Sequence, residues 1–223
     1  MSGQEPCFDV AHLGHVELFT DKPEESLDFF VNVYGLTESG REGDSVYLRA
    51  FDDYEFHTLK LTASNATGVG HIGYRTSSQA ALERRVKVIE EMGCGIGWTD
   101  GDLGHGRSYR FHDPDGHVFE LYWDTTPYVA PPEERPALKN IAQRYHGRGV
   151  GVRRIDHLNL LATDVSAIRD FMTKALGSRV TEQIQLDNGR LGGCWFTVNN
   201  KSYDIAFTED HSGGKARFHH ITY

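Results

Sequence analysis
The sequence predicts an α+β fold made of tandem βαβββ modules in two domains, with the second domain incomplete. Two observations support this prediction. A unit of one strand, one helix and about three further strands recurs roughly every fifty to sixty residues, a period typical of arrays of one supersecondary element. The first strand of each copy also carries a histidine at the same place, and these histidines are His15, His71, His157 and His220.

The first module opens with a strand over residues 12–19. A helix follows it, with Asp21 at the N-cap, Pro23 in the first turn and Gly35 at the end, because these residue types favour those positions. Two further strands, bounded by turn residues, are expected over 46–51 and 56–61.

The second module repeats this order from a strand over residues 70–75. Its helix is expected to have Ser77 or Ser78 as N-cap and to end at Gly93. The apolar stripe of this helix comprises Leu82, Val86, Ile89 and Met92. The later strands are expected over 108–111 and 118–123, on either side of a turn at 113–116.

The third module begins at Ile155, and its helix is expected between an N-cap at Asp164 and a stop at Gly177. Its later strands are expected over 194–198 and 203–208, after a turn at 187–189. Of a fourth module only the first strand is present, over 218–223. A half-built module would leave an open half-sheet, so we expect the sequence to be a fragment of a longer protein.

These modules predict a division of the chain into three parts. Residues 1–124 would form an N-terminal domain of two modules. Residues 125–150 begin with a stretch rich in Pro, Thr and Glu, which is typical of a linker. Residues 151–223 would start the C-terminal, catalytic domain.

Composition narrows the class of protein. The net charge is −9 and there is no basic run, so nucleic acid is not an expected partner. No apolar stretch is long enough to span a membrane, and the first residues do not resemble a signal peptide. The cysteines are odd in number and widely spaced, which indicates reduced thiols and a cytoplasmic protein. They are Cys7, Cys94 and Cys194.

The recurring histidines indicate a metal site. Because strand side chains alternate, two neighbouring strands can each direct one histidine to the same face, and imidazole suits divalent transition metals. Glu120 lies in an apolar run, where a carboxylate must be paired or bound to a metal. If the fourth module keeps the spacing from His71 to Glu120, its own carboxylate would lie beyond Tyr223. Two histidines and one carboxylate form the facial triad of non-haem Fe(II) oxygenases.

Several short motifs in this order resemble the type I extradiol dioxygenases of the vicinal oxygen chelate superfamily, in particular the catechol 2,3-dioxygenase (metapyrocatechase) group. The resemblance covers essentially the whole chain. The matching segments are 14–18, 119–122, 154–157, 204–207 and 217–220. It implies Fe(II) bound in the C-terminal domain by His157 and His220, a catechol substrate cleaved beside its diol by O2, and assembly into homotetramers.

One position departs from the family. Where the resemblance implies a histidine that acts as general acid and base, this sequence has Tyr203. A phenol can donate a hydrogen bond or pass a proton, but a reference pKa of about 10 makes it a poor base. Tyr203 is therefore either a catalytic replacement or a structural aromatic residue of the strand, and both interpretations stay open.

The N-terminal half contains a complete ligand set of its own: His15, His71 and Glu120. His57 falls at the repeat position of Tyr203. The resemblance nevertheless implies that this half no longer binds metal, and Arg110 places a cation beside the set, which argues against binding. Three other histidines crowd the turn at 113–116 and predict a solvated hairpin; these are His105, His112 and His117.

Two alternative functions remain. Metal-free binding modules of the same superfamily sequester aromatic compounds, and other members are glyoxalase- or epimerase-like metal lyases. The presence of histidine and glutamate at the ligand positions favours an enzyme, but a shared fold does not decide function.

Overall fold
The computed structural model describes residues 8–223. One sheet is formed by the strands β1 (Val10–Thr20), β2 (Thr37–Glu42), β3 (Ser45–Arg49), β4 (Leu59–Ala63), β5 (Gly68–Thr76), β6 (Gly95–Thr99), β7 (Ser108–His112) and β8 (Val118–Tyr122). A second sheet is formed by β9 (His157–Ala162), β10 (Arg179–Gln185), β11 (Leu191–Thr197), β12 (Ile205–Glu209) and β13 (Arg217–Thr222).

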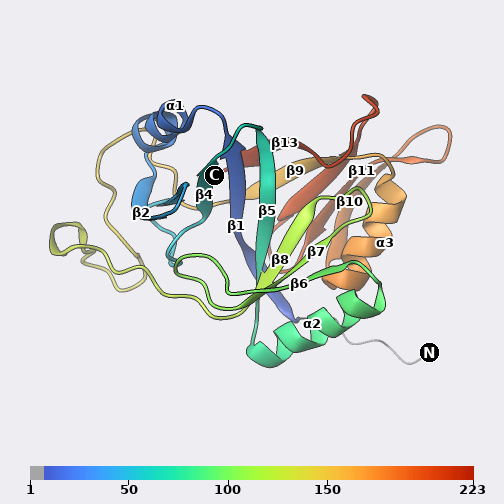
Figure 1. Cartoon of the computed structure of the whole chain (residues 1–223), viewed down its shortest axis with the longest axis horizontal. Coiled ribbons are helices and arrows are strands. Elements are labelled where there is room, and N and C mark those ends of the chain that lie inside the picture. Colours follow the sequence, from blue (N-terminus) through green and yellow to red (C-terminus); the bar gives the residue numbers. More distant parts are fainter. Residues whose placement is uncertain (1–7) are drawn as a thin grey trace.

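The helices are few and short. They are α1 (Pro23–Asp28), the π-helical turn η1 (Phe29–Tyr34) that continues it, α2 (Gln79–Glu91), the 3₁₀ turn η2 (Pro132–Glu134) and α3 (Val165–Ala175). Figure 1 shows α2 and α3 outside the sheets, near each other, and α1 at the opposite side of the molecule. The α+β prediction is confirmed. In the described part of the chain, no helix is both long and apolar enough to cross a membrane.

The strand order reveals the repeat. The first sheet runs β2-β3-β4-β1-β5-β8-β7-β6, with β1 parallel to β4 and antiparallel to β5. The second runs β10-β11-β12-β9-β13, with β9 parallel to β12 and antiparallel to β13. The pair β9–β13 therefore repeats the pair β1–β5, and both pairs join the first strands of successive modules.

The sequence did not locate the first strand after the helix in any module. These strands are β2, β6 and β10, and each lies at the edge of its sheet. All residues of β10 are exposed, and none of the residues in β2 or β6 is buried. An edge strand with little burial needs no apolar alternation, which is the signal by which strands are predicted.

Two of the three predicted helix starts are confirmed. The Ser78 hydroxyl accepts a hydrogen bond from the backbone N–H of Ala81 at the start of α2. The Asp164 carboxylate accepts from the N–H groups of Ser166 and Ala167 at the start of α3.

The third predicted helix start, at Asp21, is wrong. Lys22 is the N-cap of α1, and no side chain caps that helix. The hydroxyl of Thr20, at the end of β1, accepts from the N–H of Lys22 instead, so the strand itself provides the acceptor at the entry to the helix. The predicted end is confirmed, because Gly35 follows η1 in the left-handed conformation.

Buried apolar side chains of both sheets form one continuous core. Its helical part includes Leu82, Val86 and Ile89 of α2, and Ile168 and Met172 of α3. Two of the cysteines, Cys94 and Cys194, are buried free thiols. Burial raises the pKa of Cys194 to about 11, which suppresses its reactivity. Cys7 lies outside the described residues.

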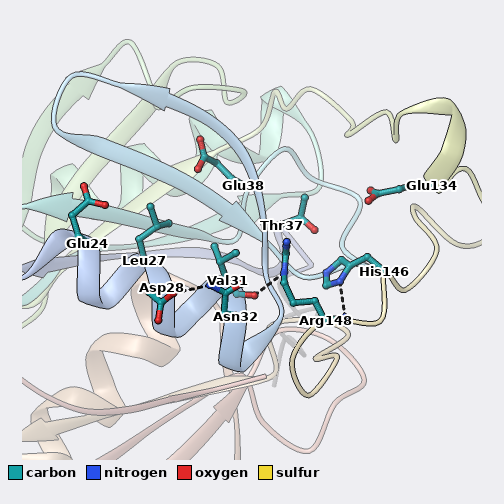
Figure 2. A pocket seen from close by; sticks show the side chains of 10 residues that line it. All are labelled: Glu24, Leu27, Asp28, Val31, Asn32, Thr37, Glu38, Glu134, His146 and Arg148. Carbon is teal, nitrogen blue, oxygen red and sulfur yellow. Dashed lines mark hydrogen bonds between the residues drawn. The ribbon is translucent and has the colours of Figure 1, made fainter.

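The predicted linker is held against the first module. The Arg148 guanidinium donates to the carbonyl oxygens of Val31 and Leu36, and His146 Nε2 donates to that of Gly35. Figure 2 shows these side chains at one end of a surface hollow of about 550 Å³ that also carries four carboxylates. None of the four repeat histidines lines this hollow, so it is not the candidate site. The domain boundaries near 124 and 150 remain a prediction.

Candidate metal centres
The structure brings His157 and His220 together, on the antiparallel neighbours β9 and β13. In their register Thr222 faces His157 and His220 faces Asn159. The two Nε2 atoms lie 3.3 Å apart, with the ring planes almost perpendicular. Two imidazole nitrogens at this separation are close enough to bind one metal ion.

Neighbouring groups orient these two rings. Nδ1 of His157 donates to Asp156 Oδ2 at 2.6 Å, which fixes the tautomer and leaves Nε2 as an acceptor. Besides His220, the Thr222 hydroxyl lies 3.3 Å from this Nε2. Partial burial, together with the neighbouring His219 and His157, lowers the pKa of His220 and favours its neutral, ligating form. His219 Nδ1 lies 2.7 Å from His220 Nδ1, so His219 is a neighbour of the pair.

Tyr203 lies directly beside His157. Its ring meets the imidazole edge-on, with 4.6 Å between centroids. The loop that carries it is fixed by the buried Asp204 carboxylate, which accepts from the Thr197 hydroxyl and the Val198 N–H. Tyr203 is therefore close to the facing histidines, but its role stays a prediction.

The N-terminal half contains a second cluster, fully buried. His15 of β1, His71 of β5 and Glu120 of β8 are each 0% exposed. The Nε2 atoms of the two histidines are 2.9 Å apart, and Glu120 Oε1 lies 3.7 Å from His15 Nε2. The three residues that the repeat predicts as a set do meet in space.

Sequence reasoning missed a further acidic residue of this cluster. Asp102, in the loop between β6 and β7, places Oδ2 3.2 Å from His71 Nε2 and 3.8 Å from His15 Nε2. The loop gives no periodic signal, so only its fold shows that Asp102 turns inward. His105 of the same loop is also buried, as is His117, and the prediction of a solvated hairpin is wrong for both.

A ring of charged groups surrounds the cluster. Glu17 Oε2 accepts from His71 Nδ1 at 2.8 Å, and Lys60 Nζ lies within 3.2 Å of both Glu17 and Asp102. Although burial lowers the pKa of His71, the carboxylates of Asp102 and Glu17 outweigh it and raise that pKa to about 9. Burial and the neighbouring histidines hold the pKa of His15 well below its usual value, so His15 is neutral.

His57 repeats the position of Tyr203, as the sequence predicts. Its ring lies 4.9 Å from that of His15 at an angle of 59°, compared with 4.6 Å and 62° between Tyr203 and His157. Arg110 also lies where the repeat places it, and its Nε contacts Glu120 Oε2 at 3.1 Å. The two clusters are therefore built on the same frame.

Comparison with known proteins identifies the family. Residues 12–121 and 154–223 match the model of the Glyoxalase/Bleomycin resistance protein/Dioxygenase superfamily. The chain is 45% identical to a metapyrocatechase of Geobacillus stearothermophilus, over 99% of this chain and 67% of that protein. The chain belongs to the extradiol dioxygenases of this superfamily. It is also 36% identical to a manganese-dependent 2,3-dihydroxybiphenyl 1,2-dioxygenase of Geobacillus genomosp. 3, over 96% of this chain and 69% of that one.

Solved extradiol dioxygenases share the fold. The 2,3-dioxygenase LapB from Pseudomonas sp. KL28 superposes with a TM-score of 0.83 at 25% identity, covering 96% of this chain and 74% of LapB. Homoprotocatechuate 2,3-dioxygenase from Brevibacterium fuscum, in complex with 3,4-dihydroxyphenylacetate, gives 0.81 at 27% identity, covering 97% of this chain and 64% of that one. The chain spans about two thirds of the length of the curated relatives it matches.

Proposed function
We propose that this extradiol dioxygenase cleaves a catechol beside its diol with O2, to a 2-hydroxymuconic semialdehyde, and that Fe(II) bound by His157 and His220 is its cofactor. The observation that carries the proposal is the pair of facing Nε2 atoms, 3.3 Å apart, on neighbouring strands. Two nitrogens bonded at about 2.1 Å to one ion are separated by about 3.0 Å at a right angle and about 3.4 Å at a tetrahedral angle. The two residues therefore fit a metal.

The chemistry of such an ion suits this reaction. Held by His157 and His220, such an ion would supply open coordination positions and redox chemistry suited to a diol and O2. The named activity of one relative depends on manganese, so Mn²⁺ is the competing cofactor. The protein is loaded anaerobically with either Fe²⁺ or Mn²⁺ and then given catechol and O2. The metal whose loaded protein forms the yellow 2-hydroxymuconic semialdehyde is the cofactor.

The residues around the pair have defined tasks. Asp156 holds His157 in the tautomer that presents Nε2. Tyr203 would donate a hydrogen bond or a proton from its hydroxyl to an oxygen of the substrate. A hollow of about 540 Å³ beside them is lined by Arg153, Arg154, Asp156 and Lys201. Its cations are paired with aspartates, namely Asp52, Asp156 and Asp204.

The test compares variants for metal content and product. His157→Ala and His220→Ala are expected to lose bound iron and ring cleavage together, whereas His211→Ala, in an exposed loop, retains both. Tyr203→Phe keeps the ring and the iron, and kcat is expected to fall about 100-fold if the hydroxyl transfers a proton. Unchanged kcat across pH would make Tyr203 structural.

Other outcomes overturn the assignment. Ring cleavage retained in the His157 variant would exclude this pair as the catalytic metal site. Tight iron binding without product would favour a metal lyase, and absence of iron binding would favour a metal-free binding module. The homotetramer expected by analogy belongs to the same proposal and is checked by light scattering.

A further inference from the structure
We propose that the N-terminal pair of modules holds a second metal ion, which is structural rather than catalytic. Its ligands are His15 Nε2, His71 Nε2, Asp102 Oδ2 and Glu120 Oε1. These four side chains come from β1, β5, β8 and the loop between β6 and β7, and their ligand atoms all lie within 4.8 Å of one another.

The separations of these atoms match one coordination shell. The distances along four edges of the cluster, three from His15 Nε2 and one from His71 Nε2 to Asp102 Oδ2, range from 2.9 to 3.8 Å. Ligand bonds of about 2.1 Å give edges of about 3.4 Å in a tetrahedron. A single ion at the centre would therefore reach all four residues with small shifts of the side chains.

Unpaired polar atoms provide the second observation. Among residues 8–223, Asp102 Oδ2 and Glu120 Oε1 have no hydrogen-bond partner although both are buried. Asp102 Oδ2 lies 3.2 Å from His71 Nε2 and Glu120 Oε1 lies 3.7 Å from His15 Nε2, but neither oxygen is hydrogen-bonded. Burying carboxylate oxygens without a hydrogen bond costs free energy unless another group binds them. A cation between the two carboxylates and the two imidazoles satisfies both oxygens at once.

The surrounding residues prepare the histidines for binding. The hydrogen bond from His71 Nδ1 to Glu17 directs Nε2 into the cluster, which is the arrangement usual for metal-bound histidine. Glycines make the space: a Cβ at Gly73 would overlap the His15 ring, and one at Gly70 would overlap the Glu17 carboxylate. Positions 70 and 73 of β5 must therefore be glycine for the Glu17 carboxylate and the His15 ring to occupy this space.

The cation at Arg110 does not occupy the proposed site. Its guanidinium binds Oε2 of Glu120 from a partly exposed position and leaves Oε1 unpaired. Within the cluster the carboxylates of Glu17, Asp102 and Glu120 outnumber the cations of Lys60 and Arg110. When both histidines are neutral, as metal binding requires, the net charge of these side chains is negative, which favours a divalent ion.

Burial decides the role of the ion. Catalytic metal sites keep one position open to substrate, whereas structural sites are closed by protein ligands. His15, His71 and Glu120 are wholly inaccessible, and Asp102 is 9% exposed. A closed site of two imidazoles and two carboxylates suits Zn²⁺, with Co²⁺ as its spectroscopic substitute. The ion would link the central strands to the loop at 100–107.

The test separates this site from the C-terminal pair. The double variant His157→Ala/His220→Ala of the full chain is stripped of metal and titrated with Co²⁺. We expect one equivalent to bind with the intense visible bands of four-coordinate cobalt, and we expect Zn²⁺ to displace it. Metal content and spectra are read without ring cleavage, so failure of the proposed catalytic function leaves this result unaffected.

Substitutions in the same background identify the ligands. Glu120→Gln and Asp102→Asn preserve shape, and each is expected to weaken Co²⁺ binding at least 100-fold. Glu17→Gln, which acts through His71, is expected to weaken it roughly 10- to 100-fold. His57→Gln and His105→Gln are matched controls, since both histidines are buried beside His15 but lie outside the ligand set; each should bind within threefold of the parent.

Thermal unfolding distinguishes a variant that has lost metal binding from one that has failed to fold. The parent should gain several degrees in Tm on addition of Zn²⁺, while Glu120→Gln should unfold as one transition with no such gain. If the double variant His157→Ala/His220→Ala binds no equivalent of Co²⁺, the proposal is overturned. His15 and His71 then share a proton and hold no metal. Loss of binding in His57→Gln with retention in Glu120→Gln overturns the ligand set.

Discussion
At the scale of single residues, equivalent positions in the two halves carry different chemistry. Tyr203 and His57 precede equivalent strands and lie at similar angles to His157 and His15. His57 is sealed among aromatic rings, whereas Tyr203 is only partly buried. The same backbone frame therefore offers a partly accessible phenol in one half and an inaccessible imidazole in the other. This difference in access supports the proposal that Tyr203, and not His57, transfers a proton.

Asp53 makes stability depend on pH. Burial raises its pKa to about 6, although the Thr58 hydroxyl and the Ala50 N–H both donate to Oδ2. Because the folded pKa lies above the unfolded value of about 3.9, the protonated form favours the native state. Its contribution is fully present below about pH 4 and is lost as pH rises to about 6, a change of up to about 3 kcal/mol.

Asp53→Asn should remove this dependence, because an amide oxygen still accepts both hydrogen bonds and carries no charge. We expect the stability of the variant relative to the parent to increase from pH 4 to pH 6 and to stay constant above that range. Urea unfolding at a series of pH values measures the difference. Parallel curves for the two proteins would show that Asp53 has an ordinary pKa.

At the scale of elements, the helices differ in how they begin. Asp164 accepts two backbone N–H groups at the start of α3, and its charge also interacts favourably with the helix dipole. Asp21 precedes α1 without capping it. The two aspartates thus form a natural pair for comparison.

Asp164→Ala is expected to lower the free energy of unfolding by about 1–2 kcal/mol, because two orphan donors and a favourable charge are lost. Asp21→Ala, the matched control, should change it by less than about 0.5 kcal/mol. Denaturant unfolding at neutral pH measures both. An equal effect of the two substitutions would contradict the cap assignment.

At the scale of the whole molecule, the halves are joined by polar contacts beside a continuous core. The Asp115 carboxylate, in the turn between β7 and β8, accepts from the N–H and the hydroxyl of Thr163, between β9 and α3. Nearby, His117 Nε2 donates to the carbonyl of Arg217 in β13. The C-terminal strand also approaches the first module, because the hydroxyls of Tyr223 and Thr58 lie 3.5 Å apart. Figure 1 shows the C-terminus close to β4.

Asp115→Ala should therefore destabilise the whole chain by about 1–3 kcal/mol, since the N–H and the hydroxyl of Thr163 both lose a charged acceptor. A single calorimetric transition is expected to persist, because the core spans both sheets. Asp187→Ala, in the exposed turn between β10 and β11, is the control and should be nearly neutral. Two separate transitions in the Asp115 variant would mean that this contact, rather than the core, couples the halves.

The sequence by itself determined the features that depend on local patterns. Strands with one buried face, a cap at Ser77 or Ser78, the cap at Asp164 and the stop at Gly35 follow from periodicity and backbone preference, which act over a few residues. The recurrence of His15, His71, His157 and His220 in one strand position was visible because the repeat preserves spacing.

Tertiary structure alone decided the features that depend on position in the sheet and on the path of loops. Little of the edge strands β2, β6 and β10 is buried, so they carry no apolar signal. At the entry to α1, Thr20, the last residue of β1, accepts the hydrogen bond that was expected of Asp21. Asp102 reaches the histidines only because its loop folds back over the sheet. A metal site collects side chains that are distant along the chain, so spacing predicts its histidines, while the packing of strands and loops determines which carboxylates complete it.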